Sequence, residues 1–236
     1  MPRPRRRLSR LILLVTLPAA IVSAFWLGLV PQRLSPFAPL DLAVADPWFL
    51  DFRLAALKTD ADLCAAVLHG PAAAASGIGD QPYDKGCGWI TAVRMSEAGG
   101  ARIAIDKLSC PMAAALAMWM EHEVQPAARQ FLNARVTAVK HMGTYACRNI
   151  AGSKTLKSFR SQHASANAID VAAFVLDDGR TVSLVKHWKG EAAEAQFLKA
   201  IHRRACRYFR VALGPNFNAA HANHFHLDRG MFKSCR

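Results

Sequence analysis

The chain has 236 residues, of which 52% are hydrophobic, and a formal net charge of +13. This length and composition predict one domain of ordinary size with a packed core, plus an extension. The positive charge could suit nucleic acid. The sequence has no basic motif interleaved with aromatic residues, however, so we expect no nucleic-acid partner. A basic protein also suits an anionic surface such as a bacterial membrane or cell wall.

Residues 1–30 have the pattern of a membrane anchor or a signal segment. Five arginines precede residues 11–30, which carry no charge and are long enough to span a bilayer. The arginines should stay in the cytoplasm, which places the rest of the chain outside it. A cleavable signal peptide is the alternative, because Val22-Ser23-Ala24 resembles a cleavage site. Both interpretations predict export, and the apolar run that continues beyond Ala24 favours an uncleaved anchor.

The cysteines agree with export. They are even in number, widely spaced and without a CxxC pair: Cys64, Cys87, Cys110, Cys147, Cys206 and Cys235. In an oxidising compartment this pattern predicts up to three disulfides, and six cysteines can pair in about fifteen ways. A zinc site built from thiolates is a weaker interpretation, because such sites usually show closely spaced pairs.

Residues 31–47 contain four prolines and predict an extended linker, after which residues 48–236 form the folded domain. We expect a helix at 48–68, a loop at 70–82, strands at 90–95 and 101–105, and a helix at 111–131 that Pro126 breaks or kinks. Further strands are expected at 136–142, 168–176, 181–185, 211–213 and 224–227, with an amphipathic helix at 191–208. This order predicts an α+β fold in which a small antiparallel sheet, flanked by helices, carries the functional site.

Three histidines, His221, His224 and His226, lie close together near the C-terminus. If residues 224–226 form a strand, His224 and His226 point to the same face, about 7 Å apart. Such a pair suits a metal site, or a metal ligand beside a group that transfers protons. The alternative is a surface loop that happens to be rich in histidine. A metal site would need ligands from elsewhere in the chain.

His163 and Asp170 are the candidates for those ligands. His163 lies in a polar segment, and Asp170 lies inside an apolar strand, where a buried carboxylate needs a partner. That partner could be an arginine or a metal. Together with His226 these residues make a set of two histidines and one aspartate. Three protein ligands with a fourth position for water are typical of catalytic zinc.

The residues around these candidates resemble known families. Ser161-x-His163 with Ala168-x-Asp170 resembles the SxHxxGxAxD motif of zinc D-Ala-D-Ala peptidases, and residues 221–226 resemble the ending of penicillin-insensitive murein endopeptidases. The whole layout, including Cys147-Arg148 and residues 214–218, is similar to the bacterial extensin-like C-terminal domain family. The likeness is loose over residues 48–235 and close over 143–228. It implies a Hedgehog/DD-peptidase-like fold with a zinc ion.

The resemblance implies a role for each candidate side chain. His163, Asp170 and His226 correspond to the zinc ligands. His224 corresponds to a histidine beside the metal that takes a proton from water or stabilises the tetrahedral intermediate. His221 corresponds to a neighbouring histidine that assists binding or proton transfer.

Two further residues receive roles from the resemblance, and two depart from the family pattern. Arg148 could bind a carboxylate or an oxyanion of the substrate, the alternative being a surface arginine, and Ser161 would hold the loop behind the ligands. Ala166 replaces the glycine of the motif, so the loop must avoid a positive φ or bear a small strain. Asn223 stands where many relatives have a catalytic glutamate, and an amide cannot act as a general base.

The expected function is therefore a zinc-dependent peptidase that acts on peptidoglycan peptides, as an endopeptidase or carboxypeptidase, through metal-activated water. It would be a single-pass protein of the inner membrane, with its N-terminus in the cytoplasm and its domain in the periplasm. A non-catalytic, zinc-containing protein that binds the cell wall or scaffolds the envelope is the alternative. We expect Cys147 to pair with Cys206, because that disulfide would join the helix at 191–208 to the site.

Overall fold

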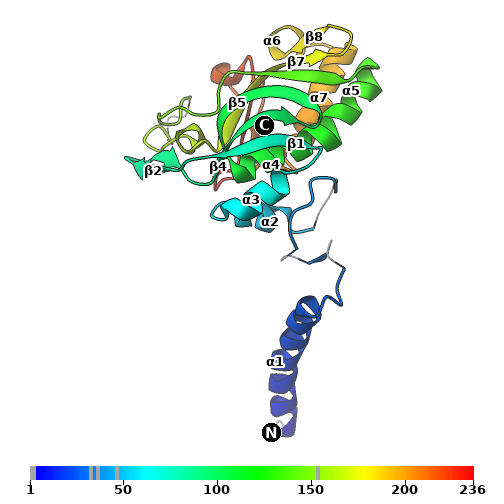
Figure 1. Ribbon diagram of the computed structural model, residues 1–236, viewed down its shortest axis with the longest axis vertical. Coiled ribbons are helices and arrows are strands. Elements are labelled where there is room, and N and C mark those ends of the chain that lie inside the picture. The colour runs from blue at the N-terminus through cyan, green and yellow to red at the C-terminus, as the bar shows by residue number, and fades with distance from the viewer. Residues whose placement is uncertain (1–3, 32–33, 36–37, 46–47, 153–154) are drawn as a thin grey trace.

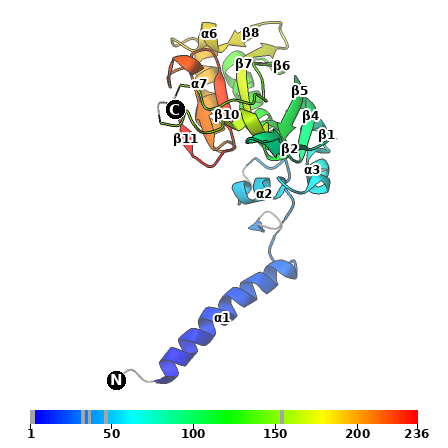
Figure 2. The same cartoon turned by 90° about the vertical axis from the view of Figure 1, so that its left-hand side faces the viewer.

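The structure is a computed structural model that describes residues 4–31, 34–35, 38–45, 48–152 and 155–236. It begins with helix α1 (Pro4–Trp26), which stands apart from the rest of the chain (Figures 1 and 2). Residues 9–26 are apolar and long enough to cross a membrane, and none of that stretch is buried against the protein. The predicted apolar segment is therefore a helix with the properties of a signal anchor or a membrane span.

Between α1 and the domain, part of the segment expected to be an extended linker contacts the folded domain. Leu40 and Leu42 are buried in the core of the domain, and the backbone oxygen of Ala45 accepts a hydrogen bond from Tyr208. Residues 32–33, 36–37 and 46–47 of the predicted linker lie outside the described residues. The part of this segment from 40 to 45 is thus packed onto the folded domain.

The helix expected at 48–68 is divided into α2 (Leu50–Ala56) and α3 (Ala61–Leu68). The second helix begins where Asp60 caps it, with Oδ1 accepting from the backbone N–H of Leu63 at 2.8 Å. A side-chain cap of this kind satisfies a backbone donor that would otherwise lack a partner, and it fixes where the helix starts.

The sheet is larger than expected, and it is mixed. Its nine strands in the described part of the chain run in the order β1-β4-β5-β6-β7-β10-β9-β11, with β8 also paired to β7. They are β1 (Ala73–Ile78), β4 (Ala92–Ala98), β5 (Ala101–Ser109), β6 (Val136–His141), β7 (Ala168–Leu176), β8 (Thr181–Ser183), β9 (Val211–Leu213), β10 (Phe225–Asp228) and β11 (Ser234–Cys235). The prediction of a small antiparallel sheet was wrong because β6 and β11 pair in parallel, with β5 and β9 respectively. A helical crossover joins β5 to β6, as a parallel pair requires.

The segment at 70–82, expected to be a loop, contains β1 and the start of a separate hairpin. This hairpin consists of β2 (Gln81–Asp84) and β3 (Cys87–Trp89). The small residues of β1 do not form a sequence pattern typical of a strand. The segment is a strand because it pairs with the apolar strand β4.

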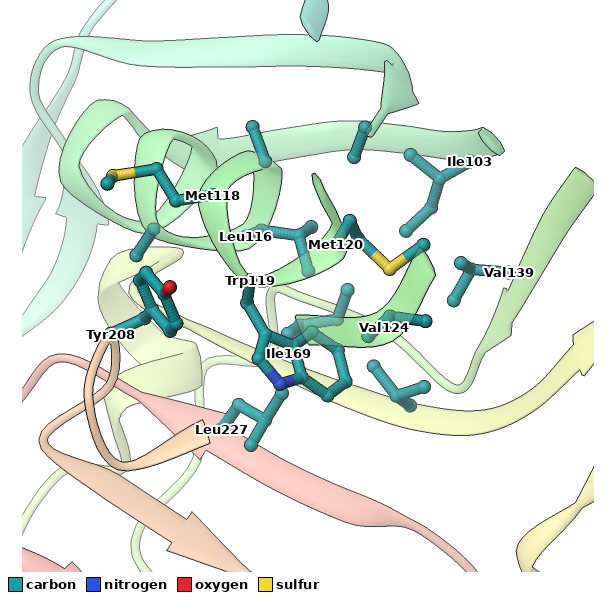
Figure 3. Packing of buried hydrophobic residues seen from close by; sticks show 14 of the residues in the cluster. Ile103, Leu116, Met118, Trp119, Met120, Val124, Val139, Ile169, Tyr208 and Leu227 are labelled. Carbon is teal, nitrogen blue, oxygen red and sulfur yellow. The ribbon is translucent and has the colours of Figure 1, made fainter. Parts of the chain in front are cut away.

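The crossover helix forms the centre of the core. Helix α4 (Cys110–Trp119) is buried on every side, as its unbroken apolar sequence requires. It continues through a π-helical turn, η2 (Met120–Val124), into α5 (Gln125–Leu132), so Pro126 lies in a first helical turn, where it is tolerated. Figure 3 shows the indole of Trp119 packed between α4 and the strands that carry Ile169 and Leu227. Helices α6 (Leu184–His187) and α7 (Ala193–Ala205) complete this layer.

The three expected disulfides form, but with different partners from the expected pair. They join Cys64 to Cys110, Cys87 to Cys147 and Cys206 to Cys235. The predicted pairing of Cys147 with Cys206 is therefore wrong. The parallel pairing of β11 with β9 brings Cys235 to the end of α7, and the β2–β3 hairpin brings Cys87 to the loop that contains Cys147.

Candidate metal centre

Two adjacent strands provide the centre of the site. Asp170 of β7 and His226 of β10 are direct cross-strand partners in an antiparallel pair. Their neighbours Ile169 and Leu227 point into the core, so by strand alternation Asp170 and His226 share the opposite face. The strand register thus brings together two side chains that are 56 residues apart in the sequence.

The third member of the cluster comes from a short helical turn just before β7. His163 lies on η3 (Gln162–Ser165), and Ser161 caps this turn by accepting the backbone N–H of His163 at 3.4 Å. The turn ends at Ala166, which has a φ of 52° and is fully buried beside Trp89. The strain foreseen for alanine at this position is therefore present, and burial of its methyl group offsets it.

The ligand atoms of these three residues lie close together. His163 Nε2 is 3.2 Å from Asp170 Oδ1, His226 Nδ1 is 2.9 Å from the same oxygen, and the two nitrogens are 3.3 Å apart. Ligand bonds of about 2.0–2.2 Å to a tetrahedral ion place neighbouring ligand atoms roughly 3.3 Å apart. The side chains are only 3%, 13% and 12% exposed, so the group is screened from bulk water. By spacing and donor type, the three residues fit a metal ion.

The outer nitrogen of each histidine also has a partner. His163 donates from Nδ1 to the backbone oxygen of Thr144 at 3.2 Å, and His226 donates from Nε2 to Asp228 Oδ2 at 2.9 Å. These contacts leave His163 Nε2 and His226 Nδ1 directed at the centre of the cluster. Metal-binding histidines usually have such an outer partner, which fixes the ring and its tautomer.

The sequence interpretation missed both outer partners. The role of Asp228 could have been found, because it lies two positions after His226 and therefore on the same face of the strand. Thr144 contributes only a backbone oxygen, and no pattern of residue types could have revealed that contact.

The electrostatics of the cluster are those of a strongly coupled network. Burial would raise the pKa of Asp170, but hydrogen bonds and charge from His163 and His226 outweigh it and hold that pKa far below its usual range. Burial would lower the pKa of His226, but its bonds to Asp170 and Asp228 raise it to about 9. The raised pKa thus reflects the two carboxylates that contact His226.

Two further histidines lie beside the cluster. His224 points Nε2 toward Asp170 Oδ1 at 3.5 Å, and its Nδ1 donates to Asn223 Oδ1 at 2.8 Å. His221, at the end of η4 (Ala219–His221), donates from Nδ1 to Asn218 Oδ1 at 2.7 Å. Burial is the main cause that lowers the pKa of both imidazoles, and the pKa of His221 falls to about 4. Both rings are therefore neutral at pH 7, with Nε2 unprotonated.

The cluster opens into a cavity of about 550 Å³. Six of the seven residues singled out in the sequence line it: Arg148, Ser161, Asp170, His221, His224 and His226. His163 lies behind them. Arg148 is exposed and lines the cavity together with His221 and His224, and its charge contributes to the lowered pKa of both rings. Much of the remaining wall is apolar, formed by Ile150, Leu156, Phe159, Phe217, Met231 and Phe232.

A comparison with protein families identifies the domain. Residues 62–236 match the family described as "Extensin-like protein C-terminus". The chain belongs to the extensin-like C-terminal family. No curated protein and no solved structure matches this extensin-like chain.

The matched segment of the extensin-like domain contains the whole histidine cluster and all six cysteines. It begins inside α3, so α1, α2 and the buried residues Leu40 and Leu42 precede it. The folded unit of this extensin-like chain is thus larger than the matched segment.

Proposed function

We propose that this extensin-like chain is an exported, membrane-anchored zinc peptidase that cuts peptide bonds in peptidoglycan. One observation carries the proposal: His163, Asp170 and His226 place three ligand atoms 2.9–3.3 Å apart at the floor of a cavity. Two neutral histidines stand beside them. Three ligands with an open side are the pattern of a catalytic rather than a structural zinc site.

The residues present suit zinc in particular. Two imidazole nitrogens and one carboxylate oxygen are a common donor set for this ion, and both histidines have outer partners that fix their tautomers. When bound, zinc would lower the pKa of water to about 7 and polarise a substrate carbonyl. His163 and His226 would hold the ion through Nε2 and Nδ1 respectively, and Asp170 through Oδ1.

The chain's own side chains suit proton transfer at this centre. Because the side-chain oxygen of Asn223 accepts a hydrogen bond from the N–H at Nδ1 of His224, the neutral ring has its lone pair on Nε2, which faces the cluster and can take a proton from the attacking water. The amide that cannot itself act as a base thus orients the residue that can. His221 lies next to His224, with ring centroids 5.3 Å apart, and can hand on or receive that proton.

The remaining features support a cell-wall substrate. Arg148 at the cavity edge can bind a carboxylate of a stem peptide. The net charge of +13 suits the anionic wall, and α1 suits attachment to the inner membrane with the domain in the periplasm. The motifs around the cluster also resemble those of zinc D-Ala-D-Ala peptidases and murein endopeptidases, families that act on this polymer.

One observation favours a second candidate, a non-catalytic zinc protein that binds the wall or scaffolds the envelope. Position 223 holds an asparagine, where the resemblance to zinc peptidases leads us to expect a glutamate, so turnover would depend on His224 as the base. Under this alternative the metal would be retained, and no peptide product would be released.

The test uses the full chain in detergent, loaded with zinc and incubated with purified peptidoglycan. Metal content is measured by mass spectrometry, and released muropeptides are identified by the same method. We expect peptide products from the wild type and loss of both metal and products in His163→Ala. His69→Ala serves as the matched control, because His69 is exposed at the end of α3, which packs on β1, and three strands separate β1 from β7 in the sheet. Product release that survives in His163→Ala would refute the mechanism, and metal binding without products would favour the second candidate.

A further inference from the structure

A second cavity, of about 250 Å³, lies beside the first. Its wall includes Asp51 and Lys58, on and just after α2, and Tyr83 of the β2–β3 hairpin. Arg210, which precedes β9, and Arg229, which follows β10, complete the wall. Part of this cavity thus comes from α2, which precedes the segment matched by the family.

The two cavities share part of their walls. Gln162 and Gly230 line both of them. A methyl group added to Gly230 would lie 2.8 Å from Cδ and 2.9 Å from Nε2 of the Gln162 side chain, so the amide lies directly against the glycine. The two cavities are therefore neighbours, with Gln162 and Gly230 as their common wall.

The second cavity has an excess of positive charge. Lys58, Arg210 and Arg229 carry three positive charges, and Asp51 is the single carboxylate among the lining residues. Arg229 is 7% exposed and binds Asp51 at 2.6 Å, whereas Arg210 approaches Asp51 only to 3.4 Å. Lys58 is exposed and has no ion-pair partner among the described residues. Asp51 thus balances one of the three positive charges and pairs with both arginines, so the lining keeps an excess of two positive charges.

One side chain on the wall of this cavity also offers a hydrogen-bond donor. Gln162 accepts from Asn167 Nδ2 through Oε1 at 2.8 Å, which leaves its own amide nitrogen free to donate toward a ligand. An anionic acceptor makes such a bond stronger than a neutral one does. Both the excess positive charge and this donor therefore indicate a negatively charged ligand.

We infer that the second cavity is a subsite for a carboxylate on an extended substrate whose scissile bond lies at the histidine cluster. The inference rests on the proposed peptidase function and adds to it the shape of the substrate. A substrate that fills both cavities must be long or branched and must carry an anionic group on the arm that passes Gln162. A cross-linked peptide dimer has that form, whereas a single short peptide does not reach across.

The test measures binding and cleavage of one probe with the full-length protein in detergent. The probe is a purified cross-linked muropeptide dimer with free carboxylates, and its carboxyl-amidated form is the comparison. Lys58→Glu reverses a charge in the second cavity, and Lys189→Glu, at an exposed lysine after α6, makes the same change in net charge elsewhere. Dissociation constants are measured by calorimetry, and the thermal unfolding midpoint verifies that each variant is folded.

We expect Lys58→Glu to raise the dissociation constant for the free dimer about fivefold to tenfold, because the change of two charge units removes one exposed attraction and adds one repulsion. It should leave binding of the amidated dimer unchanged, and Lys189→Glu should match the wild type with both probes. The difference in dissociation constant for the free dimer between Lys58→Glu and the wild type should shrink as salt is added. Equal affinity of Lys58→Glu and Lys189→Glu for the free dimer, or no binding of the dimer at all, would overturn the subsite.

Cleavage of the same dimer separates this inference from the proposed function. Hydrolysis that is indifferent to Lys58→Glu would leave the peptidase standing and remove the subsite. Carboxylate-dependent binding that Lys58→Glu weakens, with no hydrolysis by any folded and zinc-loaded sample, would leave the subsite standing and remove the peptidase.

Discussion

The contact between Asp228 and His226 gives the most direct test of how the cluster would hold a metal. Asp228 is 5% exposed, and its Oδ2 accepts from Nε2 of His226 at 2.9 Å while Nδ1 faces the other ligands. Asp228→Asn keeps the size of the side chain and an oxygen that can accept the same bond. It removes the negative charge that makes His226 a stronger ligand. The substitution therefore changes electrostatics more than packing.

The expected loss follows from that change. Removing a carboxylate behind a metal-binding histidine typically lowers metal affinity by about 10-fold to 100-fold, or about 1.4–2.7 kcal/mol. The loss should be smaller than that of Asp170→Asn, which alters a direct ligand. Asp228 also accepts a hydrogen bond from the backbone N–H of Gly230 through Oδ1. Asparagine has a single side-chain oxygen, so it can accept well only one of the two hydrogen bonds, from His226 or from Gly230. We therefore also expect a modest fall in the unfolding midpoint.

Metal affinity is measured by competition against a chromophoric chelator at fixed pH, with the full chain. Asp106→Asn is the matched control, because Asp106 is 86% exposed on β5 and its ion pair with Arg94 spans 3.8 Å. This control should bind zinc as the wild type does. If Asp228→Asn also kept full affinity, His226 could not be binding through Nδ1 with Asp228 behind it, and the proposed coordination would be wrong.

Three further predictions concern the fold around the site. Ala166→Gly removes the strain of an alanine in the left-handed region, which costs about 1 kcal/mol, but it also removes a methyl group buried near Trp89, which contributes a similar amount. The free energy of unfolding should therefore stay within about 1 kcal/mol of the wild-type value. A loss above about 2 kcal/mol would contradict the assigned strain. Glu123→Gln removes a buried charge that binds two arginines and a tyrosine, and should cost about 1–3 kcal/mol in urea unfolding; an unchanged midpoint would show that the pairs contribute nothing. Burial would raise the pKa of Asp51, but Arg229 and its other cationic neighbours lower it below 3.8, so the stability it adds is present above that pH and lost as pH falls through the lower folded value. The gap in stability between wild type and Asp51→Asn should thus be open at pH 6 and close in acid, and a gap that widened below pH 4 would reverse the sign of this reasoning.

Local patterns in the sequence were enough for much of the framework. The apolar run from Ala168 to Leu176 forms the predicted strand β7, and alternation along it separates Asp170 from the core residues on either side. The uncharged stretch after the arginines forms the predicted helix, and the even cysteines form three disulfides. The residues singled out at 148, 161, 163, 170, 221, 224 and 226 do gather around one cavity, although their chemical roles stay predictions.

Tertiary structure alone decided how these parts meet. The register that sets Asp170 opposite His226 is a property of two strands together, and a slip of one residue would have turned one of them into the core. The parallel pairing of β11 with β9 brings Cys235 to Cys206, and no local sequence pattern indicates that pairing. The second cavity likewise needs α2, the β2–β3 hairpin and the segment after β10 side by side. The spacing of residues along the chain determines which face of a helix or strand a side chain occupies. Which distant residue that side chain contacts depends on how the whole core packs.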